Sequence, residues 1–139
     1  DEFTFMAKGG IKISFVYYPF DLKQYLLEDN YPIKILSSRG IALTKAYTLN
    51  RRNSWRDYLD LYFVLRKKII TLKEIIIKAK KVYNEMFSEK LFLAQLVYTD
   101  DINKSEVEGT KILSGKISLG QVKDFFQKEI DNYLKDLKL

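Results

Sequence analysis

The spacing of the apolar residues changes at Ser38, and this change divides the chain into a β-rich front and a helical remainder. Before Ser38, the runs Glu2–Ala7 and Ile11–Tyr18 are rich in β-branched and aromatic residues and flank a Gly-Gly pair, which predicts a β-hairpin. Apolar residues alternate with others in the second run, so we expect one face of the hairpin to be clearly apolar. A short helix at Asp21–Leu27 and a short strand at Pro32–Leu36 complete the predicted front.

After Ser38 the apolar residues follow helical spacing. Helices are predicted at Arg39–Leu49, Ser54–Lys67, Leu72–Phe87, Ser88–Tyr98 and Leu119–Leu137. The segment Asp100–Ser118 is polar and contains two glycines, which predicts a loop with at most a short helical turn. The expected fold is therefore α+β: a short antiparallel β-hairpin or sheet edge, followed by a bundle of about five helices. We expect a single domain over residues 1–139, with the β-rich segment at 1–36 and the helical body at 38–139.

Composition excludes several kinds of site. The chain has no Cys and no His, which rules out Cys/His zinc sites, thiol nucleophiles and Ser-His or Cys-His catalytic pairs. Any metal would be a hard ion held by carboxylates, and Mg²⁺ is the ion expected. The net charge of +6 suits anionic partners such as nucleic acid or nucleotides, although a Lys-rich surface also explains it. Lys67 and Lys68 begin a basic stretch that either tracks an RNA backbone or is a solvated helix face.

The cellular setting is also constrained by composition. No apolar run approaches the roughly 20 residues that a membrane-spanning helix needs, so no membrane partner is expected. The absence of Cys fits a reducing, cytoplasmic location. The chain opens on Asp1 without Met, and Met6 lies inside the first predicted strand. We therefore expect the chain to be a piece of a longer protein.

Two isolated charges mark the predicted helices on either side of residue 50. Lys45 is the only charge in Ile41–Leu49, and Asp60 is the only charge in Tyr58–Leu65. A helix that is apolar nearly all round is normally buried, so each charge needs a partner or a wet cleft. A linker of about four residues favours an antiparallel helix pair. We expect Lys45 and Asp60 to face one site, where they either pair with each other or share a ligand.

The residues around the linker suit a phosphate-bearing ligand. Arg51, Arg52 and Arg56 provide a cationic rim, and Asp57 lies three residues before Asp60 on the same helix face. Guanidinium groups bind phosphate oxygens in pairs, and a lysine acts as a point charge.

Structural roles explain the same residues differently. Asp57 follows Ser54 at the spacing of a capping box, where an acid favours the start of a helix. Arg56 and Asp60 are four residues apart and would form a helix-surface pair. Lys45 and Asp60 would form a buried structural pair.

Three segments carry a resemblance to a known family. Ile41–Tyr47, Arg51-Arg52 and Arg56–Tyr62 together resemble the pattern D-I-A-x-x-K…R…R-D-x-x-D-L; Gly10–Phe15 with Tyr18-Pro19 is similar to G-V-K-x-S-F…Y-P; and Leu96–Asp101 resembles L-V-Y-F-D-D. These are landmarks of the AbiEii/AbiGii-type nucleotidyltransferase toxins, and the chain resembles their helical C-terminal portion.

The resemblance implies a nucleotidyltransferase-like toxin of a toxin–antitoxin or phage-abortive-infection pair, a class in which some members transfer nucleotides to RNA. By this likeness Lys45 would contact nucleotide phosphates, and Asp57 and Asp60 would belong to the motif needed for activity. Arg52 and Arg56 occupy its basic positions, and with Arg51 they would bind nucleotide or RNA. The implied partners are a nucleoside triphosphate, an RNA acceptor and a cognate antitoxin.

Two departures from the family pattern affect these expectations. The family's metal site comes from a Gly-Ser turn and an Asp-x-Asp strand, which nothing in this chain matches, so Mg²⁺ is expected only with a missing N-terminal half. We therefore expect this chain alone to be inactive as a transferase. The family's acid before Ile41-Ala42 is Gly40 here. The alternative is a non-catalytic remnant that binds RNA, nucleotide or an antitoxin through the basic turn between the two helices.

Overall fold

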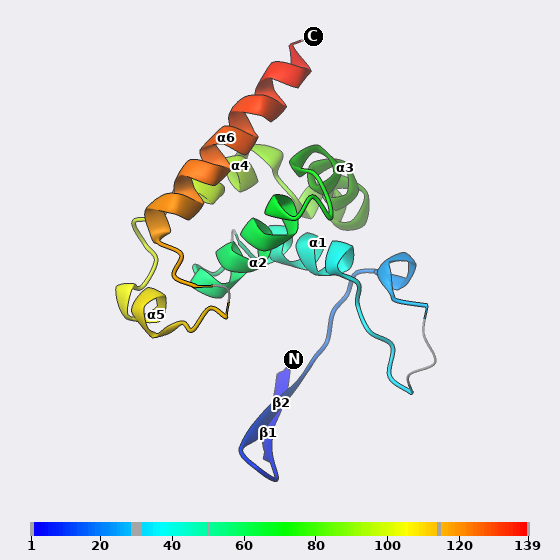
Figure 1. Cartoon of the computed structure of the whole chain (residues 1–139). Helices are drawn as coiled ribbons and strands as arrows, with labels where there is room; N and C mark the ends of the chain where they lie inside the picture. Colours follow the sequence, from blue (N-terminus) through cyan, green and yellow to red (C-terminus); the bar gives the residue numbers. More distant parts are fainter. Residues whose placement is uncertain (1, 29–31, 50, 114, 139) are drawn as a thin grey trace.

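The computed structural model describes residues 2–28, 32–49, 51–113 and 115–138. Within these ranges, a two-stranded antiparallel sheet is followed by six α-helices, which is the predicted α+β fold (Figure 1). The elements are β1 (Glu2–Ala7), β2 (Ile11–Val16), α1 (Ser38–Thr48), α2 (Trp55–Arg66), α3 (Leu72–Tyr83), α4 (Glu89–Val97), α5 (Lys104–Gly109) and α6 (Leu119–Leu137), with 3₁₀ turns η1 (Lys23–Tyr25) and η2 (Asn84–Met86).

The hairpin forms where the Gly-Gly pair predicts it. Gly9 and Gly10 have φ of +85° and +78°, a conformation that favours glycine and reverses the chain between β1 and β2. The register pairs Phe3 with Phe15 and Phe5 with Ile13, so the apolar residues share one face as expected. This face is not covered: Phe3 and Phe15 remain 65% and 62% exposed. Figure 1 shows the hairpin projecting away from the helices.

The segment between the hairpin and α1 is less regular than predicted. The helix expected at Asp21–Leu27 is reduced to the single 3₁₀ turn η1. The strand expected at Pro32–Leu36 is reduced to one bridge between Leu26 and Leu36; residue 31, beside it, lies outside the described residues. Short runs carry too little local information to separate a strand from an extended connection.

Two helical predictions also need correction. The helix expected at Leu72–Phe87 ends at Tyr83, because Asn84 adopts φ +49° and the chain continues in η2. The loop expected at Asp100–Ser118 contains the six-residue helix α5, which begins at the N-cap Asn103. This short helix is the sixth, where about five were predicted.

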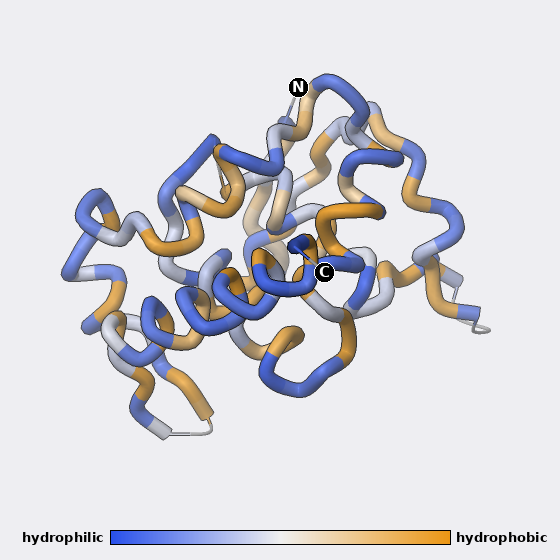
Figure 2. The backbone as a smooth tube through the Cα atoms, turned by 90° about the horizontal axis from the view of Figure 1, so that it is seen from above, coloured by the Kyte–Doolittle hydropathy of each residue, from blue (hydrophilic) through white to orange (hydrophobic). Residues whose placement is uncertain are grey.

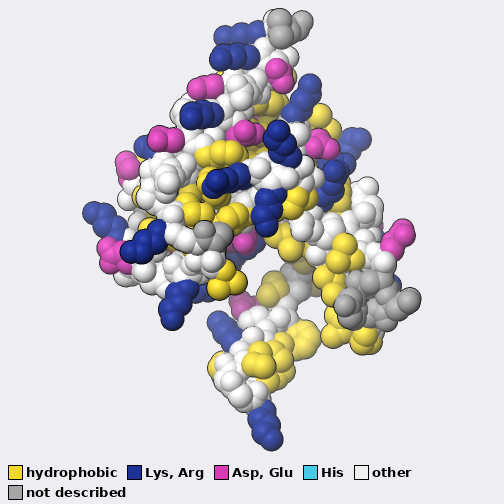
Figure 3. Space-filling view, viewed as in Figure 1, with side chains coloured by type: hydrophobic (Ala, Val, Ile, Leu, Met, Phe, Trp, Pro, Cys, Tyr) yellow, Lys and Arg dark blue, Asp and Glu magenta, His cyan; other side chains and the backbone are white. Residues whose placement is uncertain are grey.

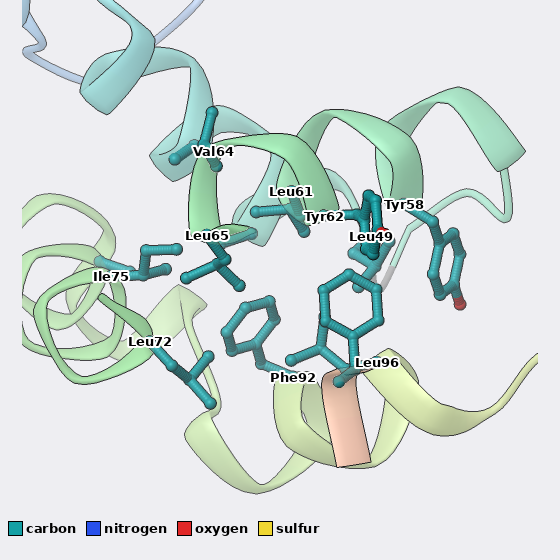
Figure 4. Close-up of a cluster of buried hydrophobic side chains, with 14 of the residues drawn as sticks. Leu49, Tyr58, Leu61, Tyr62, Val64, Leu65, Leu72, Ile75, Phe92 and Leu96 are labelled. Carbon is teal, nitrogen blue, oxygen red and sulfur yellow. The ribbon is translucent and has the colours of Figure 1, made fainter. Parts of the chain in front are cut away.

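The core lies between α1, α2, α3, α4 and α6. Figure 2 shows polar and apolar residues alternating along the helices, as expected of helices that bury one face. In Figure 4, side chains from α2, including Leu61 and Leu65, point toward Phe92 and Leu96 of α4. All four are at most 5% exposed. The aromatic ring of Tyr58 on α2 also packs near Phe126 of α6. α2 is thus held from several sides, which makes it a rigid support for the charged residues on its remaining face.

Among the described residues, no helix is long and apolar enough to cross a membrane.

Candidate functional site

Lys45 and Asp60 meet between α1 and α2, together with Asp57. The Lys45 Nζ atom donates to Asp57 Oδ1 at 2.6 Å and lies 2.8 Å from Asp60 Oδ2. Lys45 and Asp60 thus form an ion pair, one of the two arrangements expected, and Asp57 extends the pair to a group of three. The three side chains differ in burial: Asp57 is 1% exposed, Lys45 20% and Asp60 47%. The group thus runs from the protein interior to its surface.

Arg52 is a second cationic partner of Asp57. Its Nε atom donates to Asp57 Oδ2 at 2.8 Å, and its second terminal nitrogen donates to Asp57 Oδ1 at 3.1 Å, which gives a forked ion pair. The Arg52 side chain itself is 61% exposed. Asp57, the most buried of the four residues, therefore has two cationic partners.

These contacts control the protonation of the group. Burial opposes the charged form of Lys45, but its hydrogen bonds with Asp57 and Asp60 outweigh burial and raise the pKa of the ammonium above its ordinary value. Burial also opposes the charged form of Asp57, but the hydrogen bonds from Arg52 and Lys45 outweigh it and hold the pKa of that carboxyl below its ordinary value. Both groups are therefore charged at neutral pH.

The other two arginines of the predicted rim lie in different places. Arg51 lies over the Tyr47 ring, with its guanidinium carbon 3.6 Å from the ring centre, and it donates to the carbonyl oxygens of Tyr47 and Met86. It thus caps the end of α1 and ties it to η2. Arg56 is exposed and lines a cavity beside Lys45.

The start of α2 shows that Asp57 is not a capping residue. Ser54 is the N-cap, but its side chain makes no capping bond; it donates to Glu106 Oε1 at 2.8 Å. Glu106, from α5, also accepts from the backbone N–H of Trp55 at 3.1 Å. The cap is supplied from α5, some 50 residues further along the chain, and nothing in the local sequence around Ser54 indicates it. Similarly, Asp60 pairs with Lys45 instead of forming the alternative pair with Arg56.

A cavity of about 840 Å³ opens beside this group. Its walls come from α1, α2 and the segment after α5, and they are formed by Lys45, Arg56, Leu59, Asp60, Phe63, Lys67 and residues 109–113. Four cationic side chains line it, with Lys111 as the fourth, against one carboxylate, Asp60. Figure 3 shows apolar side chains over α2 with Lys and Arg side chains around them. The volume lies within the usual range of small-molecule sites, roughly 300–1,000 Å³.

Sequence reasoning missed most of this cavity. The basic stretch at Lys67 predicts either RNA contact or a solvated helix face, and Phe63, Lys111 and Leu113 are not among the predicted site residues. Phe63 and Lys67 follow Asp60 at helical spacing, a signal that would have placed them on the same face. Lys111 and Leu113 lie on an irregular segment whose position depends on the anchoring of α5 at Ser54, which no local pattern shows.

Gly40 has a clear structural role. It lies in the first turn of α1, where its backbone N–H donates to the Ser37 hydroxyl. A Cβ atom at this position would lie 2.5 Å from Leu36 Cδ1 and 2.9 Å from Tyr25 Cβ. An acidic side chain, as in the family pattern, would collide with the segment that leads into α1. Glycine at this position thus lets that segment pack closely on the helix.

The Leu96–Asp101 segment contacts Asn53 and Tyr58, which lie beside the charged group. The Tyr58 hydroxyl lies 3.0 Å from the carbonyl oxygens of both Gln95 and Tyr98, which share its one proton, and Asn53 donates to Asp101. Burial raises the pKa of Tyr58 to about 12, so its hydroxyl remains a donor at neutral pH. These bonds fix the N-terminal end of α2, so the Leu96–Asp101 segment helps to position the site residues on that helix.

Among the described residues, no group of three or more acidic side chains is arranged to hold a metal ion. Asp57 and Asp60, the two carboxylates of the site, both have Lys45 as a partner, and a second cation occupies Asp57. A divalent ion bound at these carboxylates would be repelled by the ammonium of Lys45.

Comparison with known proteins identifies a longer relative. The chain is 31% identical over 129 residues to an uncharacterized protein of Aquifex aeolicus (strain VF5). The alignment covers 91% of this chain and 59% of the relative, so the chain spans about three fifths of that protein's length. No family model matches the chain. No solved structure matches it either.

Proposed function

We propose that this chain is the phosphate-binding helical portion of a nucleotidyltransferase-like toxin of the AbiEii/AbiGii type, one partner of a toxin–antitoxin or abortive-infection pair. The observation that carries the proposal is the charged Lys45, which lies in the wall of a cavity that Arg56, Lys67 and Lys111 also line. The cavity has an excess of cations and is wide enough for a nucleotide. Three motif residues of the resemblance, Lys45, Arg56 and Asp60, line this cavity.

The contacts of Lys45 suit it to a phosphate oxygen. An ammonium has three N–H donors, and in the described structure Asp57 and Asp60 take two of them. The third donor is available to a ligand in the cavity. Because Asp57 is buried and held by Arg52, it fixes the ammonium in position and keeps it charged. A preorganised cation binds phosphate without the cost of ordering a flexible side chain.

The basic turn between α1 and α2 is less well suited to bind a ligand than the cavity. Arg51 stacks on Tyr47 and donates to two carbonyl oxygens, and Arg52 forks onto Asp57. A ligand at the turn would have to break these contacts. The alternative function, a non-catalytic module that binds through the turn, therefore has weaker support.

The test is nucleotide transfer by the complete gene product. The protein is incubated with labelled nucleoside triphosphates, Mg²⁺ and total RNA, and label in RNA is measured. We expect transfer by the wild type and its loss, by at least about a hundredfold, in Lys45→Ala and Asp60→Ala, because positioning and charge stabilisation dominate phosphoryl chemistry. Lys123→Ala, an exposed lysine on α6, is the control and should transfer normally.

Circular dichroism and thermal unfolding of each variant show whether the fold is kept. Undiminished transfer in both folded site variants would refute the proposal. Binding of RNA to the chain that weakens with salt and with Arg52→Ala, without transfer, would favour the basic-turn module instead.

A further inference from the structure

The wall of the cavity beside Lys45 combines charged and apolar side chains. Lys45, Asp60 and Arg56 lie toward the N-terminal end of α2. The rest of the wall contains Lys67, Lys111 and the apolar side chains of Leu59, Phe63, Ile112 and Leu113. Leu113 is fully exposed, so its apolar surface is open to a ligand in the cavity. A simple anion site does not need such a wall.

We propose that the apolar residues of this wall bind the base of a nucleoside triphosphate, with Phe63 as the stacking surface. The inference rests on the proposed function, since it takes the phosphates to lie at Lys45. It adds a residue that determines affinity for the base and divides the cavity into two subsites.

The spacing of the residues along α2 supports this division. Arg56, Asp60, Phe63 and Lys67 recur at intervals of four, three and four residues, so they form one face of the helix. Phe63 is about 4.5 Å further along the helix axis than Asp60, at 1.5 Å per residue. Phosphates at Lys45 would extend toward the guanidinium of Arg56, which lines the same wall. The nucleoside would then extend the other way, onto Phe63.

The Phe63 ring is suited to stacking. It is half-buried, and it packs edge-on against Tyr62, with ring centres 5.5 Å apart and planes at 73°. The neighbour fixes the ring, while the exposed part faces the cavity. Stacking on an aromatic ring tolerates any base, because every base has a π-face. We therefore expect tight binding with little preference among the four bases.

The experiment compares two ligands that share the phosphates. The affinities of ATP and inorganic tripolyphosphate for the 139-residue chain are measured by calorimetry at one fixed salt concentration. We expect ATP to bind about tenfold more tightly than tripolyphosphate, because stacking adds to the phosphate contacts. Phe63→Leu should remove most of this advantage and leave tripolyphosphate binding within about twofold. Phe63→Tyr keeps the ring and should restore ATP binding.

Two further variants separate base binding from folding. Phe125→Leu alters a half-buried phenylalanine that packs on Tyr62 from α6, outside the cavity, and should leave both affinities unchanged. Leu113→Ala cannot open the core, because Leu113 is fully exposed, and it should weaken ATP alone, by about threefold.

The outcomes distinguish the two proposals. ATP binding that is no tighter than tripolyphosphate, or that Phe63→Leu leaves unchanged, overturns the base subsite and leaves the phosphate site standing. Failure of both ligands to bind, or binding that Lys45→Met does not weaken, overturns the phosphate site and the base subsite with it.

Discussion

Lys45 keeps its charge in an almost wholly apolar stretch of α1 because α2 brings two carboxylates to its ammonium. Asp57 is the centre of the group, since it is nearly inaccessible and holds both Lys45 and Arg52. Asp60 is half-exposed and pairs with Lys45 only at the cavity side. The two acids therefore differ in place: Asp57 holds the lysine from the interior, and Asp60 lines the cavity.

Substitution of each acid should show this difference. Asp57→Ala removes three charge-assisted hydrogen bonds at a buried position, and we expect it to lower the free energy of unfolding by about 2–3 kcal/mol. Asp60→Ala removes a half-exposed ion pair and should cost no more than about 1 kcal/mol. Urea unfolding of the two variants and the wild type measures both values. Equal losses would contradict this difference.

Low pH should reduce the stability of the fold, because it protonates Asp57. Its pKa is held below the ordinary 3.8, so near that pH the folded chain binds fewer protons at Asp57 than the unfolded chain does. The stabilisation is therefore complete above about pH 3.8 and is lost as the pH falls through the lower pKa of the folded state. Carbon NMR of the Asp57 carboxyl should titrate below 3.8, and urea midpoints should fall more steeply in acid for the wild type than for Asp57→Ala.

The sequence was sufficient to single out Lys45 and Asp60, because an isolated charge in an apolar helix needs a partner and a short linker supplies one. It left the role of Asp57 open, because its position fits a cap and an ion pair equally well. The role of Glu106 was not predictable. It depends on contact between residues about 50 apart in the chain, whose approach is set by the packing of the whole body.

Among the elements, the short helix α5 contributes both to the start of α2 and to the wall of the cavity. The six residues of this helix bring Glu106 to the N-terminal end of α2 and lead directly into residues 109–113, which form a wall of the cavity. One acid thereby satisfies the start of α2 and holds the segment that carries Leu113. Burial opposes the charged form of Glu106, but hydrogen bonds from Ser54 and from the backbone of Trp55 and Arg56 hold the pKa of Glu106 below its ordinary value.

Loss of this cap should affect both stability and the cavity. Glu106→Ala should lower the free energy of unfolding by about 1 kcal/mol, as removal of an N-cap does. It should also weaken ATP binding, since the 109–113 wall loses its anchor. Glu108→Ala, an exposed acid on the same helix, is the control and should change neither quantity. A Glu106→Ala variant with unchanged melting temperature would show that the cap is dispensable.

At the scale of the whole molecule, the hairpin and the helices are joined by a narrow connection. Tyr18 and Phe20 belong to an aromatic cluster with Tyr47 and Tyr83, and the Tyr18 and Tyr83 hydroxyls are 2.8 Å apart. Before Tyr18, most side chains of β1 and β2 are exposed. The α+β class was predictable from the change in residue spacing at Ser38. The projection of the hairpin was not, because an apolar face predicts a cover without indicating what covers it.

Truncation tests this arrangement. Deletion of residues 1–16 should leave the melting temperature nearly unchanged, because the deleted strands pack mainly on each other. Deletion of residues 1–20 removes Tyr18 and Phe20 as well and should lower it by several degrees, since aromatic pairs in the cluster are lost. A large fall in the melting temperature with the shorter deletion would mean that the hairpin contributes to the body.

The two strands of the hairpin should also favour self-association in concentrated solution. Within the described residues, β1 and β2 pair only with each other, so each keeps one outer row of backbone N–H and C=O groups without a strand partner. Such edges are templates for strand addition from another molecule, and exposed aromatic residues beside them strengthen the attraction. Precipitation on concentration should therefore begin at the hairpin. A lysine in place of Phe3 would suppress it without touching the cavity.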